Sequence, residues 1–205
     1  MAVSTRKSEK RGGRITRDSL WTLEEYAKRR DDFRAQVLEH KKNRSVTLGP
    51  NLTLIFEDEM TVRYQIQEML RIEKTFDESG IKDELEAYNP LVPDGSNFKC
   101  TMMIEYEDPT ERTKKLSELI GIEDRVWVQV EGSSKVYAIA DEDLERENEY
   151  KTSAVHFMRF ELKTEMKAKL KAGASIGIGV DHPRYKYQLT EVADNVRNAL
   201  VKDLT

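Results

Sequence analysis

An alternation of apolar and mainly polar residues over 97–106 is the feature that most constrains the fold. The apolar residues at every second position are Phe98, Cys100, Met102, Ile104 and Tyr106. A period of two predicts a strand with one buried face. Runs at 126–130 and 135–140 flank a Gly-Ser turn and predict a hairpin. Residues 153–162 are apolar on both faces over much of their length, as in a central strand covered on both sides.

Helical patterns separate these strands along the chain. Thr22 and Glu25 form a capping box for a first helix. A second helix is predicted over 61–76. Its buried stripe is predicted to be Val62, Ile66, Met69, Leu70 and Phe76. Further helices are expected near 79–88 and 164–172 and at the C-terminus, with an acidic loop or short helix over 141–149. The mixture predicts an α+β fold with a mixed or largely antiparallel sheet. No Pro/Gly/Ser-rich polar stretch divides residues 15–205, so we expect one domain there.

Charge is unevenly distributed along the chain. The formal net charge is −4, yet residues 1–14 carry five basic side chains against one glutamate. This segment is rich in Ser and Gly and poor in apolar residues, so we expect a disordered basic tail. An arm for nucleic acid or another anionic surface is the alternative. The rest of the chain is acidic and has no basic stripe, which disfavours nucleic-acid binding.

Cysteine content and hydropathy restrict the location. No apolar run is long enough to span a bilayer, and no signal-peptide pattern begins the chain. Cys100 is the single cysteine, which excludes an internal disulfide framework or an all-cysteine metal site. A reducing cytoplasm is the expected location. Cys100 falls on the apolar face of its strand, so we predict an inert core thiol.

A polar stripe on the second helix is a candidate site. Tyr64, Glu68 and Arg71 share a face at helical spacing. Glu68 and Arg71 form either a surface pair or the wall of a polar pocket. The same two alternatives apply to Arg159 and Glu161 on the central strand. If Arg159 is buried, it needs a partner of opposite charge. The expected partners of Arg159 are Glu161, Glu105 or Glu68.

Histidines provide the other candidates. His40 is expected to be solvated at a helix end. His156 is either a core histidine or a ligand that faces a pocket, and Asp181 and His182 lie at a strand end, where sites often occur. Non-haem iron or zinc is conceivable with His156 and His182 as ligands, but no pair has the spacing of a helical metal motif. No nucleophile motif of the G-x-S-x-G type is present.

Glycines alternate on one face of the predicted strand at 174–181. Gly177 and Gly179 share this face. Glycine on a strand face indicates that a ring, a backbone or a ligand comes close. We expect an aromatic side chain or a helix to pack there, and a ligand surface is the alternative.

Several long motifs resemble one uncharacterised bacterial family, DUF3501. They lie at 54–58 (LIFED), 64–73 (YQIQEMLRIE), 88–96 (YNPLVPDGS), 121–127 (GIEDRVW), 138–143 (AIADED), 152–161 (TSAVHFMRFE) and 179–183 (GVDHP). The resemblance covers roughly residues 15–203 and leaves the basic tail outside. It implies no established activity or catalytic residues.

The resemblance also implies a cellular context. Genes of this family are often associated with rubrerythrin-like non-haem iron proteins and iron–sulfur oxidoreductases. We therefore expect a non-enzymatic accessory protein or binding partner in a redox or oxidative-stress system, with any cluster in the partner. The alternative is a metal- or small-ligand-binding enzyme with a His/Glu/Arg site on the central sheet. The sequence does not determine the oligomeric state.

Overall fold

The computed structural model describes residues 13–140 and 151–205, which adopt an α+β fold. The predicted acidic loop or short helix over 141–149 lies outside the described residues. So does the predicted basic tail, apart from its last two residues. The domain boundary after residue 14 therefore stays a prediction.

The described strands form two sheets, and every strand pair in them is antiparallel. The five-stranded sheet has the order β1-β2-β3-β7-β6, and the four-stranded sheet has the order β5-β4-β8-β9. The strands are β1 (Ser45–Leu48), β2 (Leu52–Glu57), β3 (Asn97–Ile104), β4 (Val126–Val130), β5 (Lys135–Tyr137), β6 (Ile139–Ala140), β7 (Val155–Glu161), β8 (Ile176–His182) and β9 (Tyr185–Leu189). The predicted α+β class with a largely antiparallel sheet is confirmed.

The predicted strand over 135–140 is divided between the two sheets. Val136 pairs with Val128 of β4, whereas Ile139 pairs with Arg159 of β7. Ala138 lies between the two short strands, and its N–H donates to the carbonyl of Val126 at 2.8 Å. The chain therefore passes from one sheet to the other at this residue.

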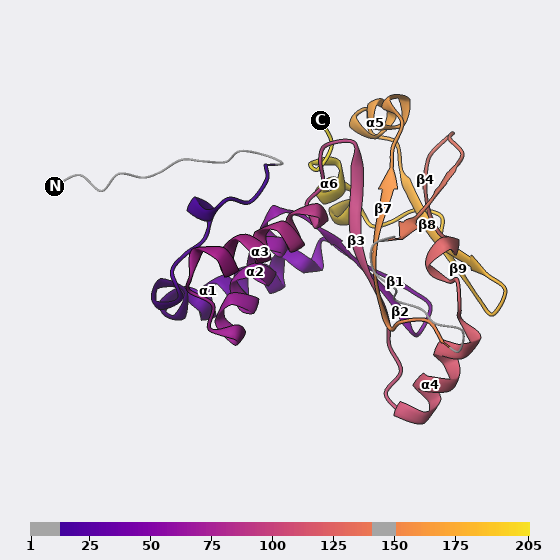
Figure 1. Ribbon diagram of the computed structural model, residues 1–205. Coiled ribbons are helices and arrows are strands. Elements are labelled where there is room, and N and C mark those ends of the chain that lie inside the picture. Colours follow the sequence, from indigo (N-terminus) through magenta and orange to yellow (C-terminus); the bar gives the residue numbers. More distant parts are fainter. Residues whose placement is uncertain (1–12, 141–150) are drawn as a thin grey trace.

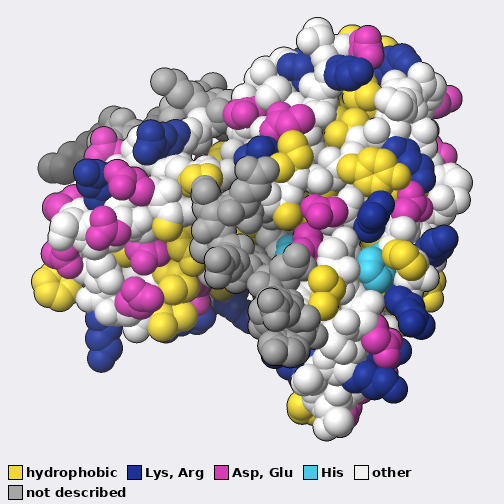
Figure 2. Space-filling view, turned by 45° about the vertical axis from the view of Figure 1, so that its right-hand side comes forward, with side chains coloured by type: hydrophobic (Ala, Val, Ile, Leu, Met, Phe, Trp, Pro, Cys, Tyr) yellow, Lys and Arg dark blue, Asp and Glu magenta, His cyan; other side chains and the backbone are white. Residues whose placement is uncertain are grey.

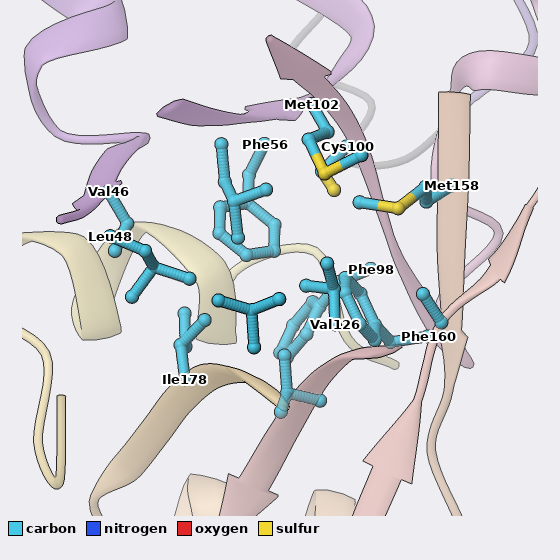
Figure 3. Packing of buried hydrophobic residues seen from close by; sticks show 14 of the residues in the cluster. Val46, Leu48, Phe56, Phe98, Cys100, Met102, Val126, Met158, Phe160 and Ile178 are labelled. Atoms are coloured by element: carbon cyan, nitrogen blue, oxygen red, sulfur yellow. The ribbon is translucent and has the colours of Figure 1, made fainter. Parts of the chain in front are cut away.

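The two sheets face each other across the main hydrophobic core. Figure 3 shows side chains of β1, β2, β3 and β7 meeting Val126 of β4 and Ile178 of β8. Phe56 and Phe98 are fully buried there, with ring centroids 6.0 Å apart. Cys100 is 2% exposed, and burial raises the pKa of its thiol well above the ordinary value. The prediction of a core thiol is confirmed.

Helices cover three sides of this pair of sheets (Figure 1). α1 (Leu23–Lys42), α2 (Glu59–Glu73) and α3 (Glu78–Tyr88) lie together on one side. α4 (Pro109–Glu118) lies at one end of the molecule, and α5 (Thr164–Lys171) and α6 (Asp194–Val201) lie at the other. None of the helices in the described part of the chain is both long and apolar enough to cross a bilayer.

The start of α1 agrees with the prediction, but the end of α2 does not. Thr22 and Glu25 form the predicted capping box. α2 ends at Glu73, because Lys74 adopts a left-handed conformation with φ of 56°. The turn carries Phe76 away from the helix, and its side chain is 80% exposed. The predicted burial of Phe76 is therefore wrong.

β7 is covered less completely than the sequence indicated. His156, Met158 and Phe160 point into the core and are buried, whereas Phe157 and Arg159 on the other face are half-buried. The prediction of a strand covered on both faces is corrected in this respect. The reason is that the helical layer lies over this outer face without closing onto all of it.

Candidate functional site

The polar stripe on α2 forms an ion cluster with α1, which we name the helix cluster (Tyr26, Arg30, Glu68 and Arg71). Arg30 donates Nε and Nη2 to the two oxygens of Glu68 at 2.8 and 2.9 Å. The Tyr26 hydroxyl donates to Oε1 of Glu68 at 2.7 Å, and Arg71 makes two contacts of 3.2 Å. The predicted Glu68–Arg71 pair exists, but Arg30 is the stronger partner because it binds in a shorter bidentate geometry.

Electrostatics fix the protonation states in the helix cluster. The hydrogen bonds from Arg30, with smaller effects of Arg71 and Tyr26, lower the pKa of Glu68 to about 2. Burial and the Glu68 carboxylate raise the pKa of Tyr26 far above its ordinary value. Glu68 is therefore a permanent anion and Tyr26 a permanent donor at neutral pH. Neither group is suited to exchanging protons with a substrate.

Tyr64 packs among aromatic rings beside this cluster. Its ring meets Phe33 edge to face at 5.8 Å, and Phe33 meets Trp21 at 5.1 Å. The guanidinium of Arg63 lies 5.2 Å from the Phe33 ring and 5.7 Å from the Trp21 ring. These contacts indicate a role for Tyr64 in holding α1 against α2.

His156 is a buried histidine with polar neighbours. Its Nε2 lies 2.9 Å from the Thr152 hydroxyl and 3.0 Å from the Ser153 carbonyl oxygen. A carboxylate oxygen of Glu123 lies 3.9 Å from the same nitrogen. The ring therefore joins the start of β7 to the short helix η3 (Glu123–Arg125).

His182 is held by the backbone on both sides. Its Nε2 lies 3.2 Å from the Ile120 carbonyl oxygen, and its Nδ1 accepts from the Arg184 N–H at 3.2 Å. Burial, together with Arg125 and Arg184, lowers its pKa. The imidazole is thus neutral at pH 7 and has both nitrogens engaged, so no lone pair remains for a metal.

Asp181 belongs to a separate surface group on the four-stranded sheet. It accepts from Lys135 Nζ at 2.9 Å and from the Tyr137 hydroxyl at 3.1 Å. The hydrogen bond from Lys135 lowers its pKa. The Lys135 ammonium also lies 3.8 Å from the ring centroid of Trp127. A β-carbon on Gly179 would come within 2.3 Å of this ring, so the predicted close packing of an aromatic on the glycine face is confirmed.

Arg159 and Glu161 pair with each other on the outer face of β7. Arg159 Nε lies 3.2 Å from Glu161 Oε1, which also accepts from Asn97 Nδ2 at 3.1 Å. Glu161 was one of the three partners expected for Arg159. Both side chains of the pair are more than a third exposed, so the contact contributes little to stability.

The eight predicted site residues therefore do not meet in one place. They belong to five groups: the helix cluster with Tyr64 beside it, the Arg159–Glu161 pair, Asp181, His156 and His182. No contact partner described above is shared between two of these groups. Within residues 13–140 and 151–205, no three His, Cys, Asp or Glu side chains are grouped so as to hold a metal ion. His156 and His182 therefore belong to no such group in these residues.

A second ion cluster, which sequence reasoning missed, joins α1 and the residue before β1 to the start of α2 and the segment after α6. We name it the junction cluster (His40, Arg44, Asp58 and Asp203). Asp58 Oδ2 lies 2.6 Å from His40 Nε2 and 3.4 Å from Arg44 Nη1. Arg44 is 2% exposed and pairs with Asp203. The expectation of a solvated His40 is wrong, because its ring contacts Asp58, the residue that caps the start of α2.

The comparisons with known proteins agree with the motifs in the sequence. A family model described as a protein of unknown function, DUF3501, matches residues 14–204. The chain belongs to the DUF3501 family. A crystal structure of a novel protein of unknown function from Burkholderia pseudomallei K96243 is similar to this DUF3501 protein. The two are 58% identical, the match covers 94% of this chain and 100% of that one, and the TM-score is 0.90. No curated protein matches the sequence.

Most of the predicted polar residues of this DUF3501 protein are engaged with partners inside the protein. Glu68, Asp181 and Arg159 each have a partner of opposite charge, and His182 is neutral and engaged on both nitrogens. A general acid or base needs a pKa near the working pH and a proton within reach of a substrate.

Proposed function

We propose that this DUF3501 protein is a non-enzymatic accessory protein that binds a rubrerythrin-like or iron–sulfur oxidoreductase protein in the cytoplasm. The observation that carries the proposal is the exposure of two large apolar side chains at residues 72–78, which we name the α2–α3 turn. Ile72 is 60% exposed and Phe76 is 80% exposed. Large apolar side chains that are exposed close together mark interaction surfaces.

Acidic side chains surround these two residues in the chain. Glu73, Asp77 and Glu78 lie in the α2–α3 turn with one basic residue, Lys74, and Glu78 pairs with Arg17 at 3.1 Å. Burial and the nearby carboxylates of Glu73 and Asp83 raise the pKa of Glu84 in α3, so negative charge is concentrated in this part of the molecule. Figure 2 shows apolar and acidic side chains close together over the helical side of the surface. This chemistry fits a partner with an apolar pocket surrounded by Lys and Arg.

The class of partner rests on the family resemblance, which implies association with rubrerythrin-like and iron–sulfur proteins. Cys100 is buried in the core and cannot ligate a cluster from there. The iron chemistry would therefore belong to the partner, and this chain would supply a recognition surface.

A binding experiment with purified proteins tests the proposal. The full chain is titrated under reducing conditions with the rubrerythrin-like protein, and separately with the iron–sulfur oxidoreductase, of the source organism. We expect a saturable complex with one of them, weakened at least ten-fold by the double substitution Ile72→Ser and Phe76→Ser. Leu38→Ser is the matched control, because Leu38 is 49% exposed on α1 outside the turn. Absence of a complex with both proteins, or equal weakening by the control, contradicts the proposal.

A further inference from the structure

A partly open cavity of about 250 Å³ lies between the outer face of the five-stranded sheet and the helices. Ile55 of β2 and Met103 of β3 form part of the sheet wall. Val62 of α2 and Leu91, which follows α3, form part of the helical wall. Because side chains alternate along a strand, Ile55 and Met103 point away from the main core. They are half-buried, whereas their neighbours in the core are fully covered.

The volume sets the size of the ligand. A cavity of about 150 Å³ in another protein core holds benzene, so 250 Å³ accommodates about ten non-hydrogen atoms. The apolar walls favour a hydrocarbon body of that size. Small-molecule sites typically combine such walls with a few polar groups that fix orientation.

Glu57 supplies one polar group of the cavity in a fixed orientation. Thr61 Oγ1 donates to its Oε2 at 2.5 Å, and Thr101 Oγ1 donates to its Oε1 at 2.6 Å. Both threonines also line the cavity. Each carboxylate oxygen can accept more than one hydrogen bond, so capacity remains for a donor on a ligand. A carboxylate held in this way is suited to binding an ammonium group.

Lys41 is the basic residue of the cavity lining. It lies in the last turn of α1 and is half-buried. In the part of the chain that the structure describes, its ammonium makes no hydrogen bond or ion pair with a side chain. The lining therefore carries a carboxylate and an ammonium with no hydrogen bond or ion pair between them among the described residues, and Lys99 lies opposite Glu57 in the pairing of β2 with β3. A ligand that carries both opposite charges would complement them.

We infer that this cavity binds a small apolar amino acid. Its ammonium group donates to Glu57, its carboxylate meets Lys41, and its side chain packs against Ile55, Met103 and Leu91. The size limit favours a side chain such as that of leucine or methionine. This site is independent of the α2–α3 turn, so it can be confirmed or lost without affecting the proposed partner interface.

Isothermal titration calorimetry on the full chain at pH 7 tests the inference with a matched set of probes. L-leucine carries both charges, 3-methylbutylamine lacks the carboxylate, and 4-methylpentanoate lacks the ammonium. We expect saturable binding of L-leucine, with at least ten-fold weaker binding of each truncated probe. Absence of saturable binding of both L-leucine and L-methionine would overturn the inference. Binding of 3-methylbutylamine as tightly as L-leucine would overturn the role of Lys41.

Variants of the lining residues separate the cavity from the rest of the surface. Glu57→Gln and Lys41→Met are each expected to weaken L-leucine binding at least ten-fold, and Met103→Trp abolishes it by filling the space. Glu105→Gln is the matched control, because Glu105 also accepts from a threonine hydroxyl, that of Thr53 at 2.7 Å. Thermal unfolding of each variant reports whether it folds. Unchanged affinity in folded Met103→Trp would contradict the assigned location.

Discussion

The helix cluster and the junction cluster use the same chemistry in different surroundings. Each contains arginine and carboxylate side chains. In the helix cluster Arg30 and Arg71 are 30% and 41% exposed, so water reaches both cations. In the junction cluster Arg44 and Asp203 are 2% and 9% exposed. The helix cluster joins two neighbouring helices, whereas the junction cluster joins residues that are 159 positions apart.

This difference determines how each cluster affects stability. Water screens the charges of an exposed pair and solvates whichever partner remains after a substitution. A buried charge that loses its partner remains desolvated, which is costly. The junction cluster also contains backbone acceptors, because Arg44 donates to the carbonyls of Phe56 and Glu57 at 2.8 and 3.1 Å. We therefore expect the fold to depend on the junction cluster far more than on the helix cluster.

Arg44→Met is expected to have the largest effect. It leaves Asp203 and Asp58 without their buried cation and removes the donor to three carbonyls, those of Phe56, Glu57 and Ala199. The free energy of unfolding should fall by about 3–5 kcal/mol. Urea denaturation of the full chain measures the change. A loss below about 1 kcal/mol would show that water enters the junction cluster and would remove the contrast between the two regions.

The pH dependence of stability at Asp203 is expected to be the second largest effect. Burial raises the pKa of Asp203 from 3.8 to about 6, although Arg44 opposes this shift. The folded state then takes up a proton more readily than the unfolded state. This group therefore increases stability as the pH falls from about 7 towards 4.

Asp203→Asn lacks this titrating group and provides the reference. Between pH 7.5 and 4 the wild type should gain on the order of 2 kcal/mol relative to Asp203→Asn. Urea midpoints at several pH values measure the difference. A constant difference across this range would show that Asp203 stays ionised against Arg44.

Glu68→Gln is expected to have the smallest effect of the three. It removes the anion that Arg30, Arg71 and Tyr26 contact, but both arginines remain partly hydrated. The loss of stability at pH 7 should be about 1–2 kcal/mol. Because the pKa of Glu68 is lowered to about 2, this contribution disappears as the pH falls from about 4.5 towards 2.

The control for Glu68→Gln is Arg159→Met, which breaks an exposed pair on β7. It should change stability by less than about 0.5 kcal/mol. Denaturation at pH 7 and at pH 3 distinguishes the two variants. If Glu68→Gln were as costly as Arg44→Met, burial would not be the cause of the difference between the clusters.

Residue patterns predicted the candidate site only where partners are close in sequence or share one strand. Glu68 and Arg71 are one helical turn apart, and Arg159 and Glu161 lie on one face of β7, so both pairs were predicted. Arg30 was not identified as the partner of Glu68, because it reaches α2 from another helix. The junction cluster gave no signal, since His40 and Arg44 lie in a polar run that is typical of solvent.

The sequence by itself determined the α+β class, the alternating strand at 97–106, the capping box at Thr22 and the close packing on Gly179. These features follow from local periodicity and from residue geometry, which are encoded within a few positions. Only the tertiary structure decided that Ala138 divides one strand between two sheets, that Phe76 is exposed and that Arg44 is buried. It also decided that a cavity remains beside Glu57. Each of these depends on where distant segments pack, and hydrophobic burial is not directional enough to specify that from local pattern.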